Sequence, residues 1–212
     1  MQNGTPIKAP APGVWAPAIT FFDHPHDTLD LAAQKKYYTY LSQSGLTGLV
    51  ILGTNAETFL LTREERRQLI HLARDAVGPS YPLMAGVGGH STAQVLEFIA
   101  DAAAAKADYA LLLPPAYFGK QTTNSVIESF FDDVAAKSPL PIVIYNFPGV
   151  CNGVDLDSEL MTQLAKRHAN IGCEADVRVR GQDHAARGDV SAGALRGVWR
   201  AVGFPHRRAE CW

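Results

Sequence analysis

The sequence predicts an α/β protein in which amphipathic helices cover a parallel β-sheet. Between residue 13 and about residue 171, short apolar runs rich in Val, Ile and Leu alternate with longer segments of helical period. The repeat is about 30 residues long, which is the size of one βα unit. Near-continuous apolar strands are typical of parallel sheets that are covered on both faces. Two architectures fit this alternation, an open doubly wound sheet and a (β/α)8 barrel.

Five strands and five helices are expected in this region. The predicted strands are GVWAPAIT (13–20), GLVILG (48–53), YPLMAGVG (81–88), DYALLLPP (108–115) and LPIVIYNFP (140–148). The predicted helices span residues 28–44, 62–77, 91–106, 122–137 and 155–168. No G-x-G-x-x-G string follows the first strand, which weakens the dinucleotide-binding version of the open sheet. The string GVGGH (86–90) after the third strand is either a tight turn or a ligand-cradling loop.

Capping residues support the helix boundaries. Asp27 or Thr28 is expected to open the first helix. Thr62, with Glu65 three residues later, predicts a capping box, and Gly78 predicts the end of that helix. The later N-cap candidates are Ser91 or Thr92 and Asp155 or Asp157.

The composition changes abruptly after Cys173. Residues 174–212 hold seven arginines and no lysine, whereas the preceding 173 residues hold five arginines and seven lysines. Residues 1–171 therefore read as about five and a half βα units, and 172–212 read as an irregular tail. Because a complete barrel needs about 250 residues, the 212-residue chain is expected to be an incomplete barrel.

Composition also excludes several classes of protein. A chain that is 47% hydrophobic and 19% charged, with a net charge of −2, is typical of a globular domain and lacks the basic excess of a nucleic-acid binder. No stretch approaches the ~18 apolar residues of a membrane span. Three widely spaced cysteines give neither a disulfide framework nor a zinc pattern. Since the first residues resemble no signal or transit peptide, we expect a cytoplasmic location.

Three strand ends are unusual, and the fourth strand ends in Pro114-Pro115-Ala116-Tyr117-Phe118. Gly53, Thr54 and Asn55 follow the second strand, and they offer a hydroxyl, an amide and main-chain N–H donors that suit a carboxylate or oxyanion. Ordinary turn chemistry explains the same tripeptide equally well. Tyr145 ends the fifth strand, where a buried phenol needs a hydrogen-bond partner. Alone it reads as a structural phenol, but near a second tyrosine and a threonine it becomes a candidate proton relay.

Several strings together resemble one family. They are GVWAPAITFF, GTNAE with LLTREER, AGVGGHST, PPAYFG and IVIYNFPGVCNGVDL. Residues 13–171 look like the pyruvate-dependent class I aldolases that include dihydrodipicolinate synthase and N-acetylneuraminate lyase. The resemblance implies a (β/α)8 barrel, a homotetramer, and a carbon–carbon or carbon–oxygen lyase that acts on a 2-oxo acid and an aldehyde. It implies no metal, no other cofactor and no partnership with nucleic acid or membrane.

The resemblance also assigns roles to particular residues. A lysine on the sixth strand of the family forms a Schiff base with the keto carbon of the substrate. Tyr145 resembles the proton-shuttling tyrosine, and Thr54 resembles the relay hydroxyl beside it. Tyr117 resembles the tyrosine that a neighbouring subunit contributes. The N–H groups around Gly53, Thr54 and Asn55 would hold the pyruvate carboxylate.

The chain departs from the synthase pattern after the fifth strand. The synthase carries an arginine after YNFP, but this chain reads Gly149-Val150-Cys151-Asn152-Gly153. The pattern P-x-x-x-N-G looks more like the 4-hydroxy-2-oxoglutarate or 2-keto-3-deoxy sugar-acid aldolases. Asn55 also replaces a second threonine of the synthase.

The Schiff-base lysine is absent from this chain, because no lysine follows Lys166. One codon choice for residues 174–178, read without its first base, encodes Lys-Leu-Thr-Cys-Gly, which resembles the lysine strand of the family. The shifted frame can continue through residues 180–183 as Val-Gly-Lys followed by Ile or Thr. Residues from about 172 onward therefore suggest an out-of-frame reading caused by a frameshift or a mis-called splice junction.

Two functional hypotheses follow. The family function is a class I aldolase-type lyase. The alternative is a truncated, frameshifted or mis-spliced product, or a pseudoenzyme that pairs with a full-length paralogue. An open arc of five strands should also leave a sheet edge unpaired and expose barrel-interior side chains, which predicts poor solubility.

Overall fold

The computed structural model describes residues 9–176 and 198–200 and shows half of a parallel barrel. Its main sheet has the order β1-β4-β5-β6-β7-β8-β9, and every pair from β1 to β8 is parallel. The strands are β1 (Trp15–Pro17), β4 (Gly48–Ile51), β5 (Leu83–Gly86), β6 (Tyr109–Leu112), β7 (Ile142–Asn146), β8 (Ile171–Asp176) and β9 (Val198–Arg200). The predicted βα alternation is confirmed, and sequential strands are neighbours, as in a barrel.

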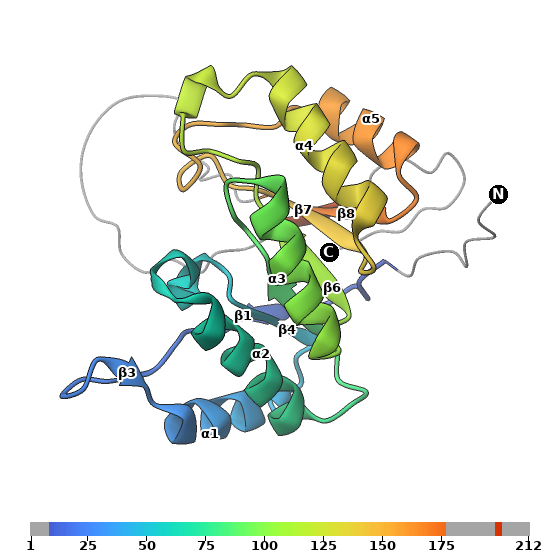
Figure 1. The fold of residues 1–212 in the computed structure, drawn as a ribbon. Coiled ribbons are helices and arrows are strands. Elements are labelled where there is room, and N and C mark those ends of the chain that lie inside the picture. The colour runs from blue at the N-terminus through green and yellow to red at the C-terminus, as the bar shows by residue number, and fades with distance from the viewer. Residues whose placement is uncertain (1–8, 177–197, 201–212) are drawn as a thin grey trace, which may run out of the picture.

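The helices follow one another along one face of this sheet, from α1 at the bottom to α5 at the top of Figure 1. They are α1 (Leu31–Ser42), α2 (Arg63–Val77), α3 (Thr92–Ala104), α4 (Asn124–Lys137) and α5 (Ser158–Arg167). Three short 3-10 helices, η1 (Thr54–Ala56), η2 (Thr58–Leu60) and η3 (Gly119–Gln121), lie in the loops that follow β4 and β6. None of the helices in the described ranges is long and apolar enough to cross a membrane.

Local capping explains most of the helix boundaries. Thr62 and Glu65 form the predicted capping box of α2, and Gly78 ends that helix with φ +82°. Ser91 and Asp157 cap α3 and α5, as expected. The cap predicted for the first helix is wrong, because Asp30 caps α1. The residues before it form a small antiparallel hairpin, β2 (Phe22–Asp23) with β3 (Thr28–Leu29), which projects to the left in Figure 1.

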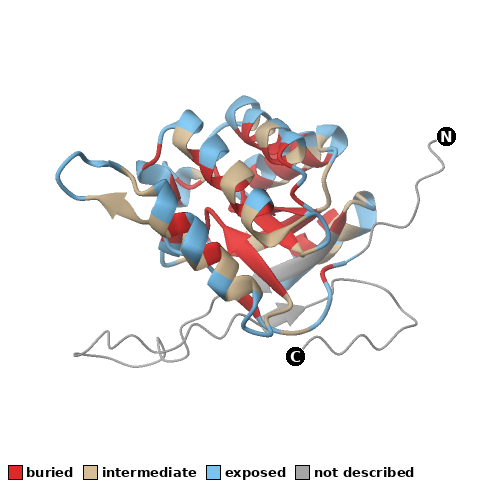
Figure 2. Ribbon diagram, turned by 90° about the horizontal axis from the view of Figure 1, so that it is seen from below, coloured by how far each residue is buried: buried red, intermediate tan, exposed pale blue. Residues whose placement is uncertain are grey.

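The two faces of the sheet carry separate apolar clusters. Alternate strand residues, such as Leu49, Ile51 and Leu83, pack under the helices. Side chains from the other face form a second buried cluster of Trp15, Val50, Met84, Tyr109, Leu111 and Val143. Figure 2 shows the buried strands beneath helices whose outer faces are exposed. The expected exposure of barrel-interior side chains is therefore wrong, since members of the second cluster are at most 8% exposed and Trp15 meets Tyr109 edge to face.

The sheet continues beyond residue 171. β8 pairs with β7 through Asp176, and β9 pairs antiparallel with β8. Both strands reach into the segment 172–212 that was expected to be irregular, because backbone pairing does not require an apolar run. The remainder of that segment lies outside the described residues, so the boundary at 171 stays a prediction.

One buried arginine forms hydrogen bonds near the amino-terminal ends of β5 and β6. The Arg74 guanidinium, on α2, lies below 10% exposure and makes five hydrogen bonds. Its acceptors are the carbonyls of Gly78, Tyr81 and Lys106 and the carboxylate of Asp108. Asp108 also accepts the Leu83 N–H at 2.8 Å, so this group joins α2 to the starts of β5 and β6.

Candidate active site

The carboxyl ends of β4 and β7 bring two predicted site residues together. Thr54 Oγ1 lies 3.4 Å from the Tyr145 hydroxyl, although 91 residues separate them in the sequence. Tyr145 is half-buried, and its ring lies 5.9 Å from that of Phe147. In parallel βα architectures the functional groups lie at this end of the strands. The structure thus brings Thr54 and Tyr145 into one site.

The environment of Tyr145 keeps its phenol neutral. Burial raises the pKa of Tyr145 above its ordinary value, and the hydrogen bond with Thr54 lowers it in part. A neutral phenol can both donate and accept a hydrogen bond, whereas a phenolate can only accept one. The pair is therefore chemically suited to pass a proton through two hydroxyls.

The turn that carries Thr54 requires unusual backbone geometry. Leu52, at the end of β4, has φ +60°, and Glu57 has φ +57°. Residues with a Cβ adopt this region at a cost of order 1 kcal/mol, and such outliers cluster at functional sites. Between them, Gly53 is buried and extended, and η1 forms a single turn closed by the Ala56 N–H to Gly53 O bond at 3.1 Å. The N–H groups of Thr54 and Asn55 precede this bond and have no intrahelical partner.

Gly86 makes room for this turn. A Cβ built on Gly86 would overlap the Leu52 carbonyl, since the backbones at the ends of β4 and β5 approach closely there. Gly86, the first residue of the GVGGH string, is therefore the point where these two strand ends approach, and both readings of the rest of the string stay predictions.

We expect Gly86→Ala to destabilise the fold by about 3 kcal/mol, because the added methyl group must displace backbone rather than a flexible side chain. Urea denaturation measures the loss. Gly88→Ala is the matched control, since its nearest neighbour would be the Phe59 ring at 3.4 Å, and it should cost far less. Equal losses in the two variants would contradict the role of the Leu52 carbonyl.

Two further residues of the site have no signal in the sequence. Thr20, from the loop after β1, donates its hydroxyl to the Ala56 carbonyl at 2.7 Å. Asn146 is fully buried beside Tyr145 and donates to the Asp155 carboxylate and to the Leu156 carbonyl, while its amide oxygen accepts the Leu156 N–H. Both sets of contacts join different loops, so hydrophobic periodicity gives no signal for either residue.

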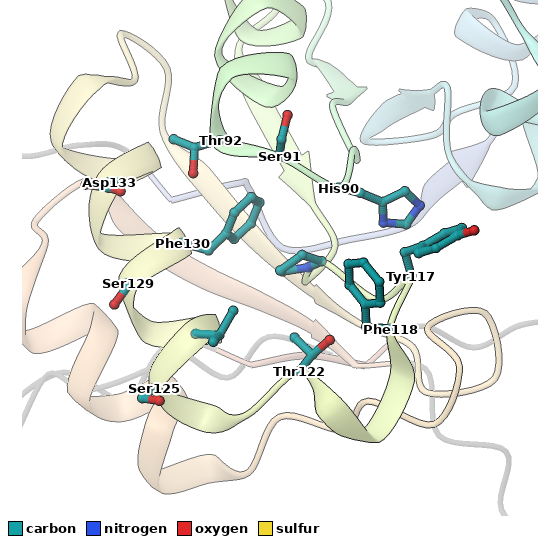
Figure 3. A pocket seen from close by; sticks show the side chains of 12 residues that line it. His90, Ser91, Thr92, Tyr117, Phe118, Thr122, Ser125, Ser129, Phe130 and Asp133 are labelled. Carbon is teal, nitrogen blue, oxygen red and sulfur yellow. The ribbon is translucent and has the colours of Figure 1, made fainter.

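Tyr117 lies apart from the Thr54–Tyr145 pair. It is 73% exposed, and its ring contacts the rings of His90 and Phe118. Together with residues of α3 and α4 it lines an outer cavity of about 510 Å³ (Figure 3). The role of Tyr117 in a neighbouring subunit's site stays a prediction.

Three loops at this end of the sheet hold one another. The Ala116 N–H donates to His90 Nδ1 at 3.4 Å, and Asn152 Nδ2 donates to the Tyr117 carbonyl at 3.5 Å. Gly119, with φ +55°, leaves the space that the Asn152 side chain occupies. The loops that follow β5, β6 and β7 therefore form one connected layer.

The remaining predicted binding residue, Asn55, is exposed at the surface of the turn. Within the described ranges, no group of three or more His, Cys, Asp or Glu side chains is arranged to hold a metal ion. The site is thus a set of hydroxyls, a phenol and main-chain donors.

Relatives of known name share most of this chain. A protein of Coccidioides immitis, named as a mitochondrial 4-hydroxy-2-oxoglutarate aldolase, is 68% identical over 164 residues, which are 77% of this chain and 52% of that protein. The L-threo-3-deoxy-hexylosonate aldolase of Aspergillus niger is 38% identical over 172 residues, which are 79% of this chain and 50% of that protein. This chain therefore spans about half the length of these relatives. Their names agree with the aldolase branch and the lyase class that the resemblance implies.

Solved structures show the same fold. A dihydrodipicolinate synthase family protein from Coccidioides immitis matches with a TM-score of 0.72 and 64% identity, over 77% of this chain and 51% of that one. YagE, a prophage protein of E. coli K12 solved in complex with pyruvate, matches with a TM-score of 0.73 and 30% identity, over 79% of this chain and 55% of that one. The predicted barrel class is confirmed.

The expected cytoplasmic location is contradicted by these comparisons. The Coccidioides relative and a 40% identical protein of Emericella nidulans both have names that place them in mitochondria. The location expectation rested on the absence of a recognisable leader, which is weak because transit peptides have no fixed sequence.

A family model settles the affiliation. It matches residues 11–177 and carries the description dihydrodipicolinate synthetase family. It includes the turn with Thr54, the strand with Tyr145 and the loop with Tyr117. On this match and on the fold, the chain belongs to the dihydrodipicolinate synthetase family.

Proposed function

We propose that Thr54 and Tyr145 form the proton relay of a class I aldolase site that acts on pyruvate or a related 2-oxo acid. The observation that carries the proposal is the 3.4 Å approach of Thr54 Oγ1 to the Tyr145 hydroxyl at the carboxyl end of a parallel sheet. The free N–H groups of Thr54 and Asn55 point to the same chemistry, since main-chain donors at a turn suit a carboxylate. The pyruvate complex of YagE supports the substrate class.

The relatives favour one branch of the family. Their names refer to 4-hydroxy-2-oxoglutarate and L-threo-3-deoxy-hexylosonate. The loop Gly149–Gly153 lacks an arginine for a second carboxylate, which agrees with that branch. We therefore propose 4-hydroxy-2-oxoglutarate or a 2-keto-3-deoxy sugar acid as the substrate, cleaved to pyruvate and an aldehyde.

The proposed chemistry needs the amine of a lysine on the sixth strand, and this chain has no lysine there. In a class I aldolase the lysine amine attacks the keto carbon, water leaves, and the protonated imine accepts the electrons of the broken C–C bond. No lysine follows Lys166 in these 212 residues. We propose that this chain alone forms no imine, so that Thr54 and Tyr145 have no reacting group to serve.

The alternative of an out-of-frame tail keeps a specific observation in its favour. The shifted frame places lysine at position 174, which lies in β8, the sixth strand of the parallel order, and the lysine of the family is on its sixth strand. Sequencing the transcript across codons 171–183 tests this alternative. A transcript that encodes Glu-Ala-Asp at 174–176 in frame removes it and favours a pseudoenzyme that pairs with a full-length paralogue.

The proposed inactivity is tested by trapping. We expect that the purified chain, incubated with pyruvate and sodium borohydride, gains no mass at any lysine, because no amine lies at the end of the sixth strand. A family member that carries the lysine is the positive control, and intact-protein mass spectrometry followed by peptide mapping is the measurement. A pyruvate adduct at one specific lysine of this chain would overturn the proposal.

A further inference from the structure

The turn that carries Thr54 is tied to a distant part of the chain by one buried hydroxyl. Thr20 Oγ1 donates to the Ala56 carbonyl at 2.7 Å across 36 residues, and Thr20 is only 8% exposed. Ala56 is the last residue of η1 and is itself buried. The carbonyl that ends this turn therefore receives its donor from the loop after β1.

The turn needs such support because it is short and flanked by unfavourable backbone. It has one turn of 3-10 helix, no side-chain cap at Gly53, and left-handed residues on either side, Leu52 and Glu57. Backbone in this region persists only where surrounding contacts hold it. A loss of the Thr20 bond would let the turn relax and carry Thr54 away from Tyr145.

Thr20 is itself held firmly. Gln34, fully buried on α1, donates its amide to the Ile19 carbonyl at 3.0 Å and accepts the Phe21 N–H at 2.8 Å. The two residues that flank Thr20 are thus fixed to a helix by one side chain. A continuous set of contacts runs from α1 through Thr20 and Ala56 to Thr54 and Tyr145.

We propose that Thr20 is a positioning residue that holds Thr54 Oγ1 within hydrogen-bonding distance of the Tyr145 hydroxyl. Its significance for catalysis rests on the proposed function, but its effect on Tyr145 does not. The proposal concerns the geometry of the relay, so it can be measured without substrate.

The test is a double-mutant cycle read at Tyr145. The full chain is labelled with 3-fluorotyrosine, whose phenol ionises at lower pH than that of tyrosine, and its seven tyrosines are followed by fluorine NMR during a pH titration. Tyr145→Phe identifies the signal of Tyr145. The variants are T20V, T54V and the double variant, with circular dichroism as the check that each is folded.

We expect T20V to raise the apparent pKa of the Tyr145 phenol by about half a pH unit, because the Thr54 hydrogen bond stabilises the ionised form. T54V should raise it similarly, and adding T20V to T54V should change it no further. T20S, which keeps the hydroxyl, should restore the wild-type titration.

Thr58→Val is the matched control. Thr58 lies just after the same turn and is 4% exposed, and its hydroxyl has no hydrogen-bond partner among the described residues. T58V should therefore leave the titration of Tyr145 unchanged. If T20V does not fold, Thr20→Ala, which admits water to the Ala56 carbonyl, answers the same question.

Either of two results would overturn the proposal. One is an unchanged Tyr145 titration in T20V. The other is an equal change in the wild-type and T54V backgrounds, which would mean that Thr20 acts on the fold and not through Thr54. Because the readout involves no pyruvate, failure here is distinguishable from failure of the proposed aldolase chemistry in the trapping experiment.

Discussion

Replacing Arg74 with methionine should lower the free energy of unfolding by about 3 kcal/mol, because three carbonyls and the Asp108 carboxylate would lose the donor group that they share. Arg74 is 8% exposed, so water cannot fully replace the guanidinium. A loss of this size is a large part of the 5–15 kcal/mol that typically stabilises a domain. Thermal unfolding should therefore shift down by about 10 °C.

Arg63→Met is the matched control for this prediction. Arg63 also lies on α2 and bonds to Glu97 and Asp101, but its side chain is 49% exposed. Exposed ion pairs contribute about 0–1 kcal/mol, so this variant should remain close to the wild type. If both variants lost the same stability, the role of burial in the Arg74 cluster would be refuted.

The second large effect should appear at alkaline pH. Burial raises the pKa of the Cys151 thiol from its ordinary value of 9.0 to about 12. The folded chain then keeps the thiol proton that the unfolded chain releases, so the unfolded state binds fewer protons and stability falls as pH rises. The contribution is fully present below about pH 9 and is lost progressively as pH rises toward 12.

Denaturation at two pH values measures this effect. At about pH 10.5 the free energy of unfolding of the wild-type chain should be about 2 kcal/mol lower than at about pH 8 on account of Cys151 alone. Cys151→Ala removes the titrating group, so its loss between the two pH values should be smaller by that amount. Tyr38 and Tyr145, whose pKa values burial also raises, act in the same direction above about pH 10 and are common to both proteins. If the free energy of unfolding fell by the same amount in the wild type and in Cys151→Ala between the two pH values, the raised pKa of the Cys151 thiol would be excluded.

The sequence carried enough information to predict the layers of the fold. Buried parallel strands such as GLVILG leave an apolar run, and the Thr62–Glu65 box marks a helix start, since both depend on neighbours in the chain. The sequence does not predict the hairpin before α1, because its strands have two residues each, too few to show a period of two. Strand ends were placed too far out because polar backbone contacts, not hydropathy, end them.

The site was predictable only in part, because its residues are far apart in the sequence and come together only in the folded chain. Thr54 and Tyr145 are candidates because they follow or end predicted strands, the family resemblance gives them their roles, and the structure joins them. Thr20 and the fully buried Asn146 act by bonds to backbone groups of other loops, which leave no pattern in the local sequence. The left-handed backbone of Leu52 was equally invisible, since an apolar residue at a strand end ordinarily continues the strand.

The connected loops after β5, β6 and β7 have a consequence for attempts to change what the site recognises. His90 accepts the Ala116 N–H, Asn152 donates to the Tyr117 carbonyl, and Gly119 leaves space for the Asn152 side chain. If residues 149–153 alone were replaced by those of a relative, a different side chain at position 152 would face Gly119 and the Tyr117 carbonyl, which here accommodate asparagine. Exchanges between members of the family should therefore replace the loops after β5, β6 and β7 together. A chimaera in which only one of these loops is replaced should not acquire the selectivity of the donor protein.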